Sequence, residues 1–286
     1  MGSMASPGWG SVSLPALERG RGRLDGARLD QKETFETVKP SGRGRVVAIM
    51  PARNSAKTLE ATVKRIPPGC IDQIILVDNA SKDDTVAIAE RLGITVVRHP
   101  VDRGFGGSIK TLFRTALDAG ADYIIELHPD NQYDPTGIPA MLEKIHPDRY
   151  AMVIASRFLP ARRALEGGMP WWKFVANRVL TTLNNAMLGV RMSEFHSGFR
   201  VYSATWARQV PFDLFSNDFK LGFQLISQAV IDGWKLGEVP GFCAYFAEAS
   251  QNPLKGSIVY GWGTLTESFK VFLHRAGLGT LKARTS

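Results

Sequence analysis

The stretch QIILVDNASKDDTVAIAERLGITVVRH, residues 73 to 99, contains the pattern that decides the fold. QIILV is a short apolar run of the kind that forms a buried strand, and it ends at Asp78. DDTVAIAERLG (83 to 93) then predicts a helix, because acidic residues occupy its first turn and a glycine ends it. ITVVRH (94 to 99) predicts a further strand. A strand, a helix and a strand in this order predict a largely parallel sheet.

The same alternation continues on both sides of this stretch. VVAIM (46 to 50) predicts a strand, and a helical pattern runs from Ser55 to Ile66. Later segments predict helices over 108–120, 136–145, 174–189 and 219–233, and strands over 122–127, 150–156 and 234–240. We therefore expect an α/β protein with a mostly parallel, Rossmann-like sheet covered by helices on both faces. In such sheets ligands bind beyond the carboxyl ends of the strands.

The chain is expected to form one domain over residues 45–250, with an extension at each end. Residues 1–44 open with Met-Gly-Ser-Met, which is typical of an expression scar, and include the Arg- and Gly-rich run ERGRGRLDGAR (18 to 28). We expect this segment to be a disordered basic tail. Residues 251–286 are expected to form an amphipathic helix and a tail.

Composition narrows the class of partner and the compartment. A formal charge of +8 and a pI near 9.6 favour an anionic partner, such as a nucleotide, a phospholipid, a phosphorylated substrate or nucleic acid. The two cysteines are far apart, which favours a reducing compartment, and cytoplasm is the expectation. Uncharged runs reach only about a dozen residues, whereas a spanning helix needs about 20. We expect the protein to be at most peripheral at a membrane.

The stretch ELHPDNQYDP (126 to 135) follows a predicted strand and concentrates chemically active side chains. His128, Asp130 and Gln132 alternate along an extended segment, so their side chains should project to one side. Hard divalent cations prefer oxygen ligands, and Mg²⁺ is commonly held by one or two carboxylates together with substrate phosphates. These residues therefore predict a metal-diphosphate site, with a solvated acidic loop as the alternative.

Six motifs then occur in an order that resembles a known family: PARN (51 to 54), LVDNASKDDT (76 to 85), DRGFGGSIKT (102 to 111), HPDNQYDP (128 to 135), ASRF (155 to 158) and HSGFRVYS (196 to 203). Together they resemble the inverting, family-2 glycosyltransferases of the GT-A fold, and most closely the dolichyl- or polyprenyl-phosphate sugar synthase branch. The resemblance covers about residues 46 to 245. It implies a sugar-nucleotide donor, a divalent cation (Mg²⁺ or Mn²⁺) and hexosyl transfer with inversion.

The resemblance also implies where the donor nucleotide binds. Asp78 would grip the nucleoside, because a carboxylate can accept hydrogen bonds from a ribose hydroxyl or a base N–H. The alternative is that Asp78 only starts a turn with Asn79. The donor-binding residues expected from the motifs are Pro51, Ala52, Arg53, Asn54, Asp78, Asn79, Gly106, Gly107 and Lys110. The glycines, with Gly104, would let the backbone approach the donor closely.

Three positions depart from the family pattern. The usual metal motif is Asp-x-Asp-x-Gln, whereas this chain has His128 in place of the first carboxylate. The histidine could shift the preference toward Mn²⁺, weaken metal binding, or leave Asp130 and Gln132 to hold the ion. PARNSA lacks a nucleoside-side carboxylate that the family often has, and VDN replaces VDD.

On the acceptor side, the resemblance implies that Arg157 and Arg200 clamp phosphate, for which a guanidinium is well suited. The alternative for these arginines is an ion pair with a carboxylate such as Glu194. An anionic lipid phosphate needs no general base, whereas an alcohol needs a carboxylate to take its proton. Glu194 and Asp218 are the candidates, and either could instead be a helix cap or an ion-pair partner.

Two segments favour contact with a membrane surface. Four basic residues surround the Trp171–Trp172 pair: Arg162, Arg163, Lys173 and Arg178. Near the carboxyl end, Ile258, Trp262, Leu265, Phe269 and Phe272 would form one apolar helical face, for which core packing is the commoner explanation.

The favoured function is transfer of a sugar from a nucleoside-diphosphate sugar to a polyprenyl-phosphate-like acceptor. One alternative is transfer to a hydroxyl of a soluble metabolite or glycan. The other is a non-catalytic protein that binds nucleotide or nucleic acid, although nucleic acid is not the expected partner. The sequence leaves the sugar, the base and the oligomeric state open.

Overall fold

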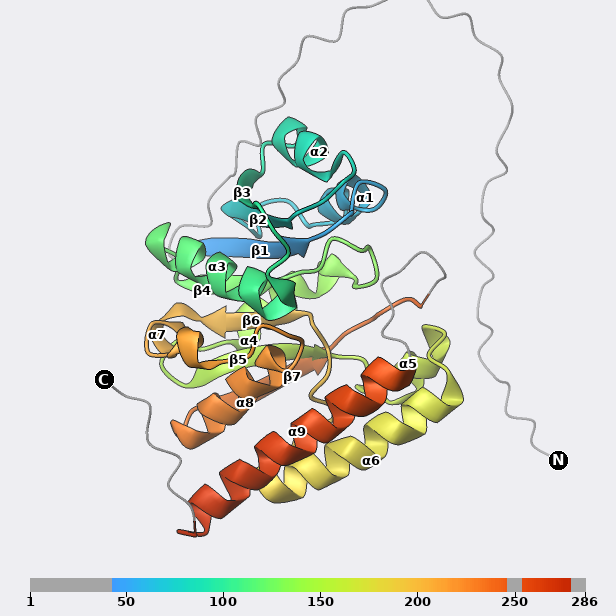
Figure 1. The fold of residues 1–286 in the computed structure, drawn as a ribbon, viewed down its shortest axis with the longest axis vertical. Helices are drawn as coiled ribbons and strands as arrows, with labels where there is room; N and C mark the ends of the chain where they lie inside the picture. The colour runs from blue at the N-terminus through green and yellow to red at the C-terminus, as the bar shows by residue number, and fades with distance from the viewer. Residues whose placement is uncertain (1–42, 246–253, 279–286) are drawn as a thin grey trace, which may run out of the picture. The chain divides into compact units, whose positions relative to one another are not determined.

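The computed structural model describes residues 43–245 and 254–278, with side chains in the last segment from Gly256 onward. Within these residues seven strands form one sheet, in the order β3-β2-β1-β4-β6-β5-β7 (Figure 1). The strands are β1 (Val46–Ala52), β2 (Gln73–Asn79), β3 (Thr95–His99), β4 (Tyr123–Glu126), β5 (Tyr150–Ser156), β6 (Arg200–Ser203) and β7 (Lys235–Pro240). The α-helices are α1 (Leu59–Lys64), α2 (Thr85–Arg91), α3 (Gly104–Asp118), α4 (Ile138–Lys144), α5 (Arg162–Glu166), α6 (Trp171–Leu188), α7 (Ala204–Ala207), α8 (Leu221–Ile231) and α9 (Leu254–Arg275). Two 3₁₀ turns, η1 (Pro135–Gly137) and η2 (Phe212–Leu214), complete the described elements.

The sheet is mostly parallel, as the sequence predicted. β1 pairs in parallel with both β2 and β4, β2 pairs in parallel with β3, and β5 with β7. The exception is β6, which runs antiparallel between β4 and β5. Its sequence RVYS is only four residues long and is buried throughout, and so short a segment gives no signal of direction or neighbours.

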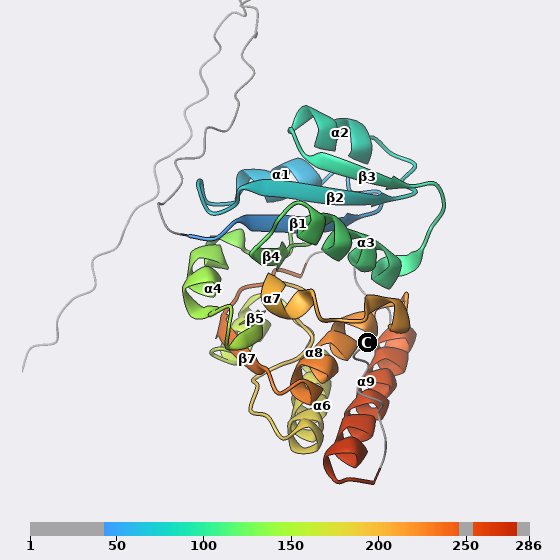
Figure 2. The ribbon, with the colours of Figure 1, turned by 90° about the vertical axis from the view of Figure 1, so that its left-hand side faces the viewer.

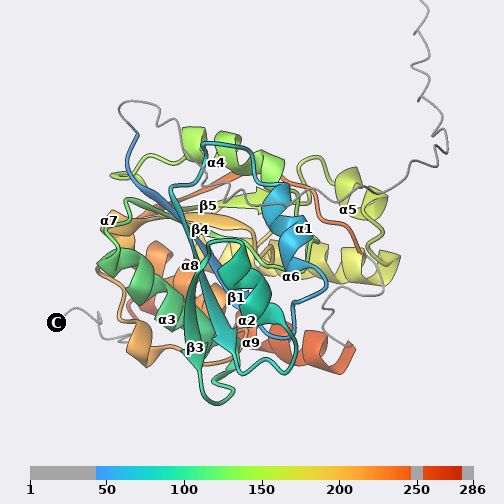
Figure 3. The ribbon, with the colours of Figure 1, turned by 90° about the horizontal axis from the view of Figure 1, so that it is seen from above.

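Helices cover both faces because the side chains of a strand alternate between them. Val47 and Ile49 of β1 face a core that includes residues of α3 and α8, whereas Ala48 and Met50 face a core with residues of α1, α2 and α4. Figure 3 shows α3 on one side of β1 to β3, and α1 and α2 on the other. The prediction of an α/β sheet with helices on both faces is therefore confirmed.

Helices α6 and α9 form a pair that packs along its length (Figures 1 and 2). A buried hydrogen bond of 2.9 Å from Ser268 Oγ to Asn184 Oδ1 joins the two helices. The helical C-terminal extension expected from the sequence is therefore present as α9. None of the helices in the described part of the chain is both long and apolar enough to cross a bilayer.

One helix boundary differs from the prediction, and some of the predicted segments lie outside the described residues. α3 begins at Gly104 rather than at the predicted Ser108, so the glycine-rich segment before Ser108 is the first turn of the helix. Helix propensity alone disfavours glycine, and only the packing of this turn explains its presence there. The predicted basic tail, 1–44, lies outside the described residues except for its last two positions, as do 246–253 and 279–286.

Candidate functional site

Polar residues collect where the parallel strands end. In the register of the sheet, Ala52 of β1 lies opposite Asp78 of β2, and Ile49 lies opposite Glu126, the last residue of β4. A cavity of about 440 Å³, here called the strand-end cavity, opens at this edge. It is lined by Pro51, Ala52, Arg53, Ser55, Asn79, Asp102, Gly104, Phe105, Ser108, His128, Pro129, Asp130 and Phe219. Pro51, Ala52, Arg53 and Asn79 were predicted at the donor nucleotide, and they share this cavity.

Asp102 is the residue in this cavity that the sequence analysis missed. Its carboxylate forms an ion pair with Arg53 and accepts hydrogen bonds from the Gly104 amide (2.8 Å) and from Asn79 Nδ2 (2.6 Å). The Gly104 N–H, followed by Asn79 and Arg53, lowers the pKa of Asp102 although burial opposes this. The carboxylate is therefore ionised beside the cavity. Asp102 is the first residue of the motif DRGFGGSIKT, so the sequence did contain a signal for it.

Asp78 and Asn54 have different surroundings from those predicted. Asp78 is buried, does not line the strand-end cavity, and accepts a hydrogen bond of 3.3 Å from the Ser81 amide. This geometry is the turn that the sequence analysis gave as the alternative. Asn54 has a positive φ of 53° and its Oδ1 accepts from the Lys82 amide at 2.8 Å. Asn54 thus joins the loop after β1 to the loop after β2, whereas Asp78 stabilises the turn within the loop after β2.

Gly106, Gly107 and Lys110 of α3 pack against other parts of the protein and do not line the strand-end cavity. Gly104 does line it. A Cβ added at Gly106 would lie 2.4 Å from the carbonyl oxygen of Ser216, and the Gly106 amide donates to Asn217 O at 2.8 Å. A Cβ at Gly107 would meet the Arg103 side chain at 2.8 Å. The expected close backbone approach exists, but its partner is the segment before α8.

Lys110 is buried beside the same segment. Its ammonium group donates to the carbonyl oxygen of Phe215 at 2.5 Å and to Asn217 Oδ1 at 2.8 Å. Burial lowers its pKa. The contacts tie α3 to the loop before α8, and this differs from the donor-binding position that the resemblance implied.

The residues quoted from 126 to 135 lie between two cavities. His128 and Asp130 line the strand-end cavity, and together with Gln132 they also line a second cavity of about 440 Å³. This second cavity is here called the helix-pair cavity because α6 and α9 form one wall. Its lining residues are His128, Asp130, Gln132, Tyr133, Arg157, Met169, Trp172, Lys173, Ala176, Asn177, Leu180, His196, Phe219, Cys243, Tyr245, Ser257 and Tyr260. The three side chains predicted to project to one side therefore do reach one cavity.

Glu126 lies behind this row and is almost fully buried. It accepts hydrogen bonds from Tyr202 Oη at 2.6 Å, and His128 Nε2 lies 3.2 Å from its other oxygen. Burial acts to lower the pKa of His128, but the hydrogen bond and charge of Glu126 outweigh it and raise the pKa. The nitrogen Nε2 of His128 is thus directed to a carboxylate.

The donor atoms near Asp130 suit a hard cation in part. Asp130 Oδ1 accepts from the Gln132 amide at 3.1 Å, and Gln132 Nε2 donates to Ala244 O at 3.2 Å, which leaves the amide oxygen of Gln132 to face other groups. His128 has only Nδ1 left for a metal, because Nε2 contacts Glu126. In the described residues no three His, Cys, Asp or Glu side chains converge as a metal site. Asp130 and Gln132 supply oxygen atoms of the kind that Mg²⁺ or Mn²⁺ prefers, and such an ion would need further ligands from phosphate or water.

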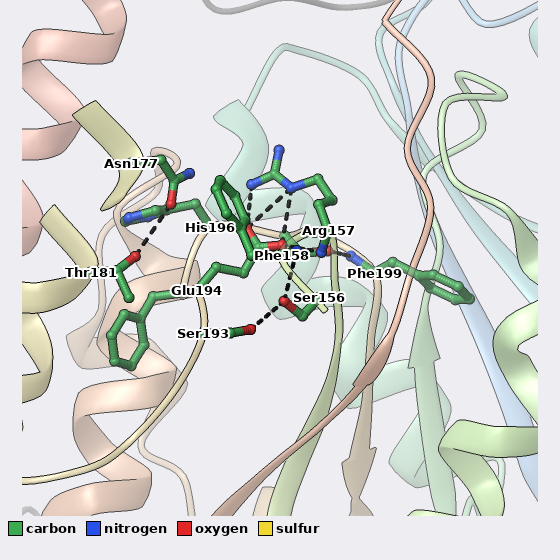
Figure 4. A network of polar contacts seen from close by, with 12 residues as sticks. Ser156, Arg157, Phe158, Asn177, Thr181, Ser193, Glu194, His196 and Phe199 are labelled. Carbon is green, nitrogen blue, oxygen red and sulfur yellow. Dashed lines mark hydrogen bonds and ion pairs between the residues drawn. The ribbon is translucent and has the colours of Figure 1, made fainter. Parts of the chain in front are cut away.

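Arg157 forms the buried ion pair that the sequence analysis gave as the alternative to phosphate binding. Its Nε lies 3.1 Å from each carboxylate oxygen of Glu194, its Nη2 donates to the same carboxylate, and its Nη1 donates to Tyr245 Oη. The Arg157 amide also donates to Glu194 at 2.6 Å. Figure 4 shows the guanidinium turned toward Glu194. Glu194 is fully buried in this pair, so it is not placed to act as a general base.

Arg200 and Asp218 are also engaged with protein groups. Arg200 donates to three carbonyl oxygens, those of Ser197 (2.8 Å), Gly222 (2.7 Å) and Phe195 (3.1 Å). Asp218 is exposed, lines neither cavity, and accepts from the Lys220 amide at 2.8 Å before α8. Asp218 therefore stabilises the start of a helix, which was the structural alternative for it.

His196 is a buried histidine from the motif HSGFRVYS. Its Nδ1 lies 3.3 Å from Tyr260 Oη, and its Nε2 has no hydrogen-bond partner among the described residues. Burial lowers its pKa to about 4, so the ring is neutral near pH 7. It joins the loop before β6 to α9.

Comparison with known proteins shows which family the chain belongs to. A sequence model described as "Glycosyl transferase family 2" matches residues 47–210, more than half of the chain. The chain belongs to this family. The matched residues extend from β1 to β6. They include the residues at the strand ends that line the two cavities. The GT-A fold expected from the motifs is confirmed by structural neighbours. One is the glucosyl-3-phosphoglycerate synthase of Mycobacterium tuberculosis in complex with Mn²⁺, UDP and glucosyl-3-phosphoglycerate, which matches with a TM-score of 0.57 and 18% identity over 83% of this chain and 82% of that one.

Two relatives resemble this family-2 chain over most of their length. An undecaprenyl-phosphate mannosyltransferase of Micrococcus luteus is 26% identical, covering 75% of this chain and 89% of its own. A UDP-N-acetylglucosamine–dolichyl-phosphate N-acetylglucosaminyltransferase of Methanococcus voltae is 24% identical, covering 68% and 84%. The chain is therefore a family-2 glycosyltransferase.

Proposed function

We propose that this protein transfers a sugar from a nucleoside-diphosphate sugar to a polyprenyl-phosphate-like acceptor, with inversion at the anomeric carbon. The observation that carries the proposal is the position of Asp130, whose side chain borders both the strand-end cavity and the helix-pair cavity. A donor in the first cavity and an acceptor in the second would meet at this residue. Binding two reactants side by side is itself a large part of catalysis.

The strand-end cavity suits the nucleoside diphosphate. Its floor is the carboxyl edge of β1 and β2, where ligands of open α/β sheets bind. Asp102 and Asn79 present polar atoms that suit a ribose or a base, and Arg53 adds a positive charge. When bound at Asp130 and Gln132, a divalent cation would stabilise the negative charge that develops on the departing diphosphate. These residues of the chain hold and orient the diphosphate end of the donor.

The helix-pair cavity favours an acceptor that is already anionic. Asp130 is the one carboxylate among the described residues that line it, and that side chain is the expected metal ligand. Glu194 is neutralised by Arg157, and Asp218 lies elsewhere. An alcohol acceptor would need a base within hydrogen-bond reach, whereas a phosphate oxygen can attack without losing a proton. The names of both relatives, which act on undecaprenyl phosphate and dolichyl phosphate, support the same acceptor class.

The outer surface of the α6–α9 pair supports contact with a membrane, where such an acceptor resides. Large apolar side chains are exposed along both helices: Trp171, Val175, Val179 and Leu183 on α6, and Ile258, Val259, Trp262, Phe269 and Phe272 on α9. α6 carries Lys173 and Arg178 and no acidic residue. Apolar side chains flanked by cations favour an anionic lipid surface. The apolar stripe predicted on α9 is partly solvent-facing, so core packing does not account for all of it.

A transfer assay tests the proposed reaction. The protein would be given candidate sugar nucleotides with Mn²⁺ or Mg²⁺, and polyprenyl phosphate and soluble sugars would be offered in parallel as acceptors. Asp130→Asn is expected to reduce transfer roughly 100- to 1,000-fold, whereas the exposed Asp118→Asn on α3 serves as the matched control. Transfer confined to soluble hydroxyl acceptors, or full turnover by Asp130→Asn, would contradict the proposal.

Membrane contact is tested separately by flotation with vesicles that contain anionic lipid. The double variant Trp171→Gln, Trp262→Gln should float less than the wild type, because it removes two exposed indole rings from the proposed contact surface. Leu214→Gln, at an exposed leucine of η2, is the control. Equal flotation of wild type and double variant would show that this surface does not bind lipid.

A further inference from the structure

Helix α6 contributes both apolar and charged side chains to the lining of the helix-pair cavity. Trp172, Ala176 and Leu180 recur every four residues and line the cavity in one row. From Trp172 to Leu180 the helix rises by eight residues, which is about 12 Å. Leu180 lies close to α9, since a Cβ added at Gly261 would come within 3.2 Å of its side chain. The apolar row therefore follows the seam between α6 and α9.

Lys173, on the same helix, adds a positive charge to the cavity lining. Among the residues that line the cavity, Arg157 and Lys173 are the arginine and lysine side chains. The guanidinium of Arg157 is directed at Glu194 and Tyr245, as described above. Lys173 has no carboxylate within 4.0 Å in the described part of the chain, and its Nζ lies 5.7 Å from the centre of the Tyr245 ring. Between the two cations that line the cavity, it is thus the one without an adjacent carboxylate among the described residues.

The surroundings of Lys173 favour an incoming anion. Partial burial and then the charge of Arg157 lower the pKa of Lys173, so its charged form is less well stabilised than in water. Tyr245 accepts a hydrogen bond from Arg157, and burial raises the pKa of its phenol to about 12, so the hydroxyl keeps its own proton. An ammonium group beside a phenol is a suitable pair of donors for a phosphate oxygen.

We propose that Lys173 binds the phosphate of the acceptor, and that the first isoprene units of the acceptor lie along Trp172, Ala176 and Leu180 in the α6–α9 seam. This inference rests on the proposed function for the class of acceptor. It replaces the arginine clamp implied by the motifs with a lysine from α6. The rest of the prenyl chain would lie against the membrane at the exposed apolar side chains of both helices.

A binding experiment separates the two halves of this proposal. Geranylgeranyl phosphate, geranylgeraniol and glycerol 3-phosphate would each be titrated into the protein by calorimetry in a defined non-ionic detergent. We expect the wild type to bind geranylgeranyl phosphate more tightly than either of the other two probes. Lys173→Met should weaken binding of geranylgeranyl phosphate roughly 10- to 100-fold, to the level of the alcohol, because a charge-assisted hydrogen bond is lost. Lys173→Arg should retain the preference for phosphate, and Lys144→Met, an exposed lysine at the end of α4, should bind like the wild type.

The apolar half is tested by filling the seam. Ala176→Phe should weaken geranylgeranyl phosphate binding without changing the affinity for glycerol 3-phosphate, whereas Ala186→Phe, an exposed position on the same helix, should change neither. Unchanged binding by Lys173→Met overturns the phosphate site, and unchanged binding by Ala176→Phe overturns the seam. Equal affinity of the wild type for glycerol 3-phosphate and geranylgeranyl phosphate would overturn the prenyl assignment.

The outcome is independent of the transfer assay. If the wild type binds geranylgeranyl phosphate through Lys173 but does not glycosylate polyprenyl phosphate, the binding site stands and the proposed reaction fails. If it glycosylates polyprenyl phosphate and Lys173→Met leaves the KM for that acceptor unchanged, the reaction stands and the site fails.

Discussion

Replacing Glu194 by glutamine distinguishes a structural carboxylate from a catalytic base. Glutamine keeps an oxygen for the Arg157 amide, which donates to Glu194 at 2.6 Å, but it removes the negative charge beside a buried guanidinium. Breaking a buried ion pair by removing one partner costs about 3–5 kcal/mol, because the remaining charge is left uncompensated. For a domain of this size about 1 kcal/mol corresponds to roughly 2–4 °C, so the Tm should fall by roughly 6–20 °C.

The measurement is thermal unfolding of wild type and Glu194→Gln, followed by transfer kinetics well below both Tm values. Glu166→Gln is a suitable control, because its pair with Arg162 is exposed and spans 3.5 Å, and exposed pairs contribute about 0–1 kcal/mol. The double variant Arg157→Met, Glu194→Met should unfold at a higher temperature than Glu194→Gln, because it leaves no unpaired charge in the interior.

A general base would give the opposite result. Loss of a base reduces turnover by about 100- to 10,000-fold while leaving the fold intact. A Glu194→Gln protein with the Tm of the wild type and such a loss of kcat would therefore refute the structural interpretation. That result would also favour an alcohol as the acceptor.

Three further predictions follow from buried contacts. Gly106→Ala should lower the Tm, since its Cβ would lie 2.4 Å from the Ser216 carbonyl oxygen and overpacking costs about 1–3 kcal/mol, whereas Gly137→Ala, whose Cβ would be 3.8 Å from its neighbour, should change it little. Lys110→Met should reduce the free energy of unfolding by about 1–3 kcal/mol, because two acceptors lose their donor, and should leave nucleotide affinity in titrations unchanged; weaker nucleotide binding at full stability would restore the donor-binding role. Burial lowers the pKa of His196 from 6.5 to about 4, so only the unfolded state binds that proton between these values, and stability should fall by up to about 3 kcal/mol as the pH drops through the window. Urea titrations from pH 7 to 4 should show a smaller pH dependence for His196→Phe than for the wild type, and equal curves would count against a buried neutral imidazole.

The fold was predictable where the signal is local. The alternation from 73 to 99 contains its own strand, helix and strand, and the observed β2, α2 and β3 follow it within two residues at each end. The position of β6 was not predictable in the same way. Its four residues lie between β4 and β5 because long-range pairing places Arg200 opposite both Glu126 and Ile154, and no local pattern encodes that choice.

The glycine-rich segment shows a related limit. From the sequence, Gly104 and Gly106 suggest close approach of the backbone to some partner, and close approach is what the structure has. The partner, however, is the backbone at Ser216 and Asn217, more than a hundred residues later in the chain. A glycine indicates that there is little room for a side chain. It does not indicate whether a ligand or another loop occupies the neighbouring space.

The arginines show why side-chain type alone misassigns a binding site. Arg157 and Arg200 have the chemistry of phosphate ligands, but the folded chain directs their N–H groups to one carboxylate, one phenol and three carbonyl oxygens. Such groups can bind a ligand only by giving up interactions already made. Lys173 is less conspicuous in the sequence, where it is one of several basic residues near a tryptophan pair. In the folded chain it lines a cavity and forms no ion pair with a carboxylate of the residues that the structure describes. Since a ligand is stabilised by charge that the protein has not already neutralised, the unpaired lysine is the better candidate, and that distinction exists only after the chain has folded.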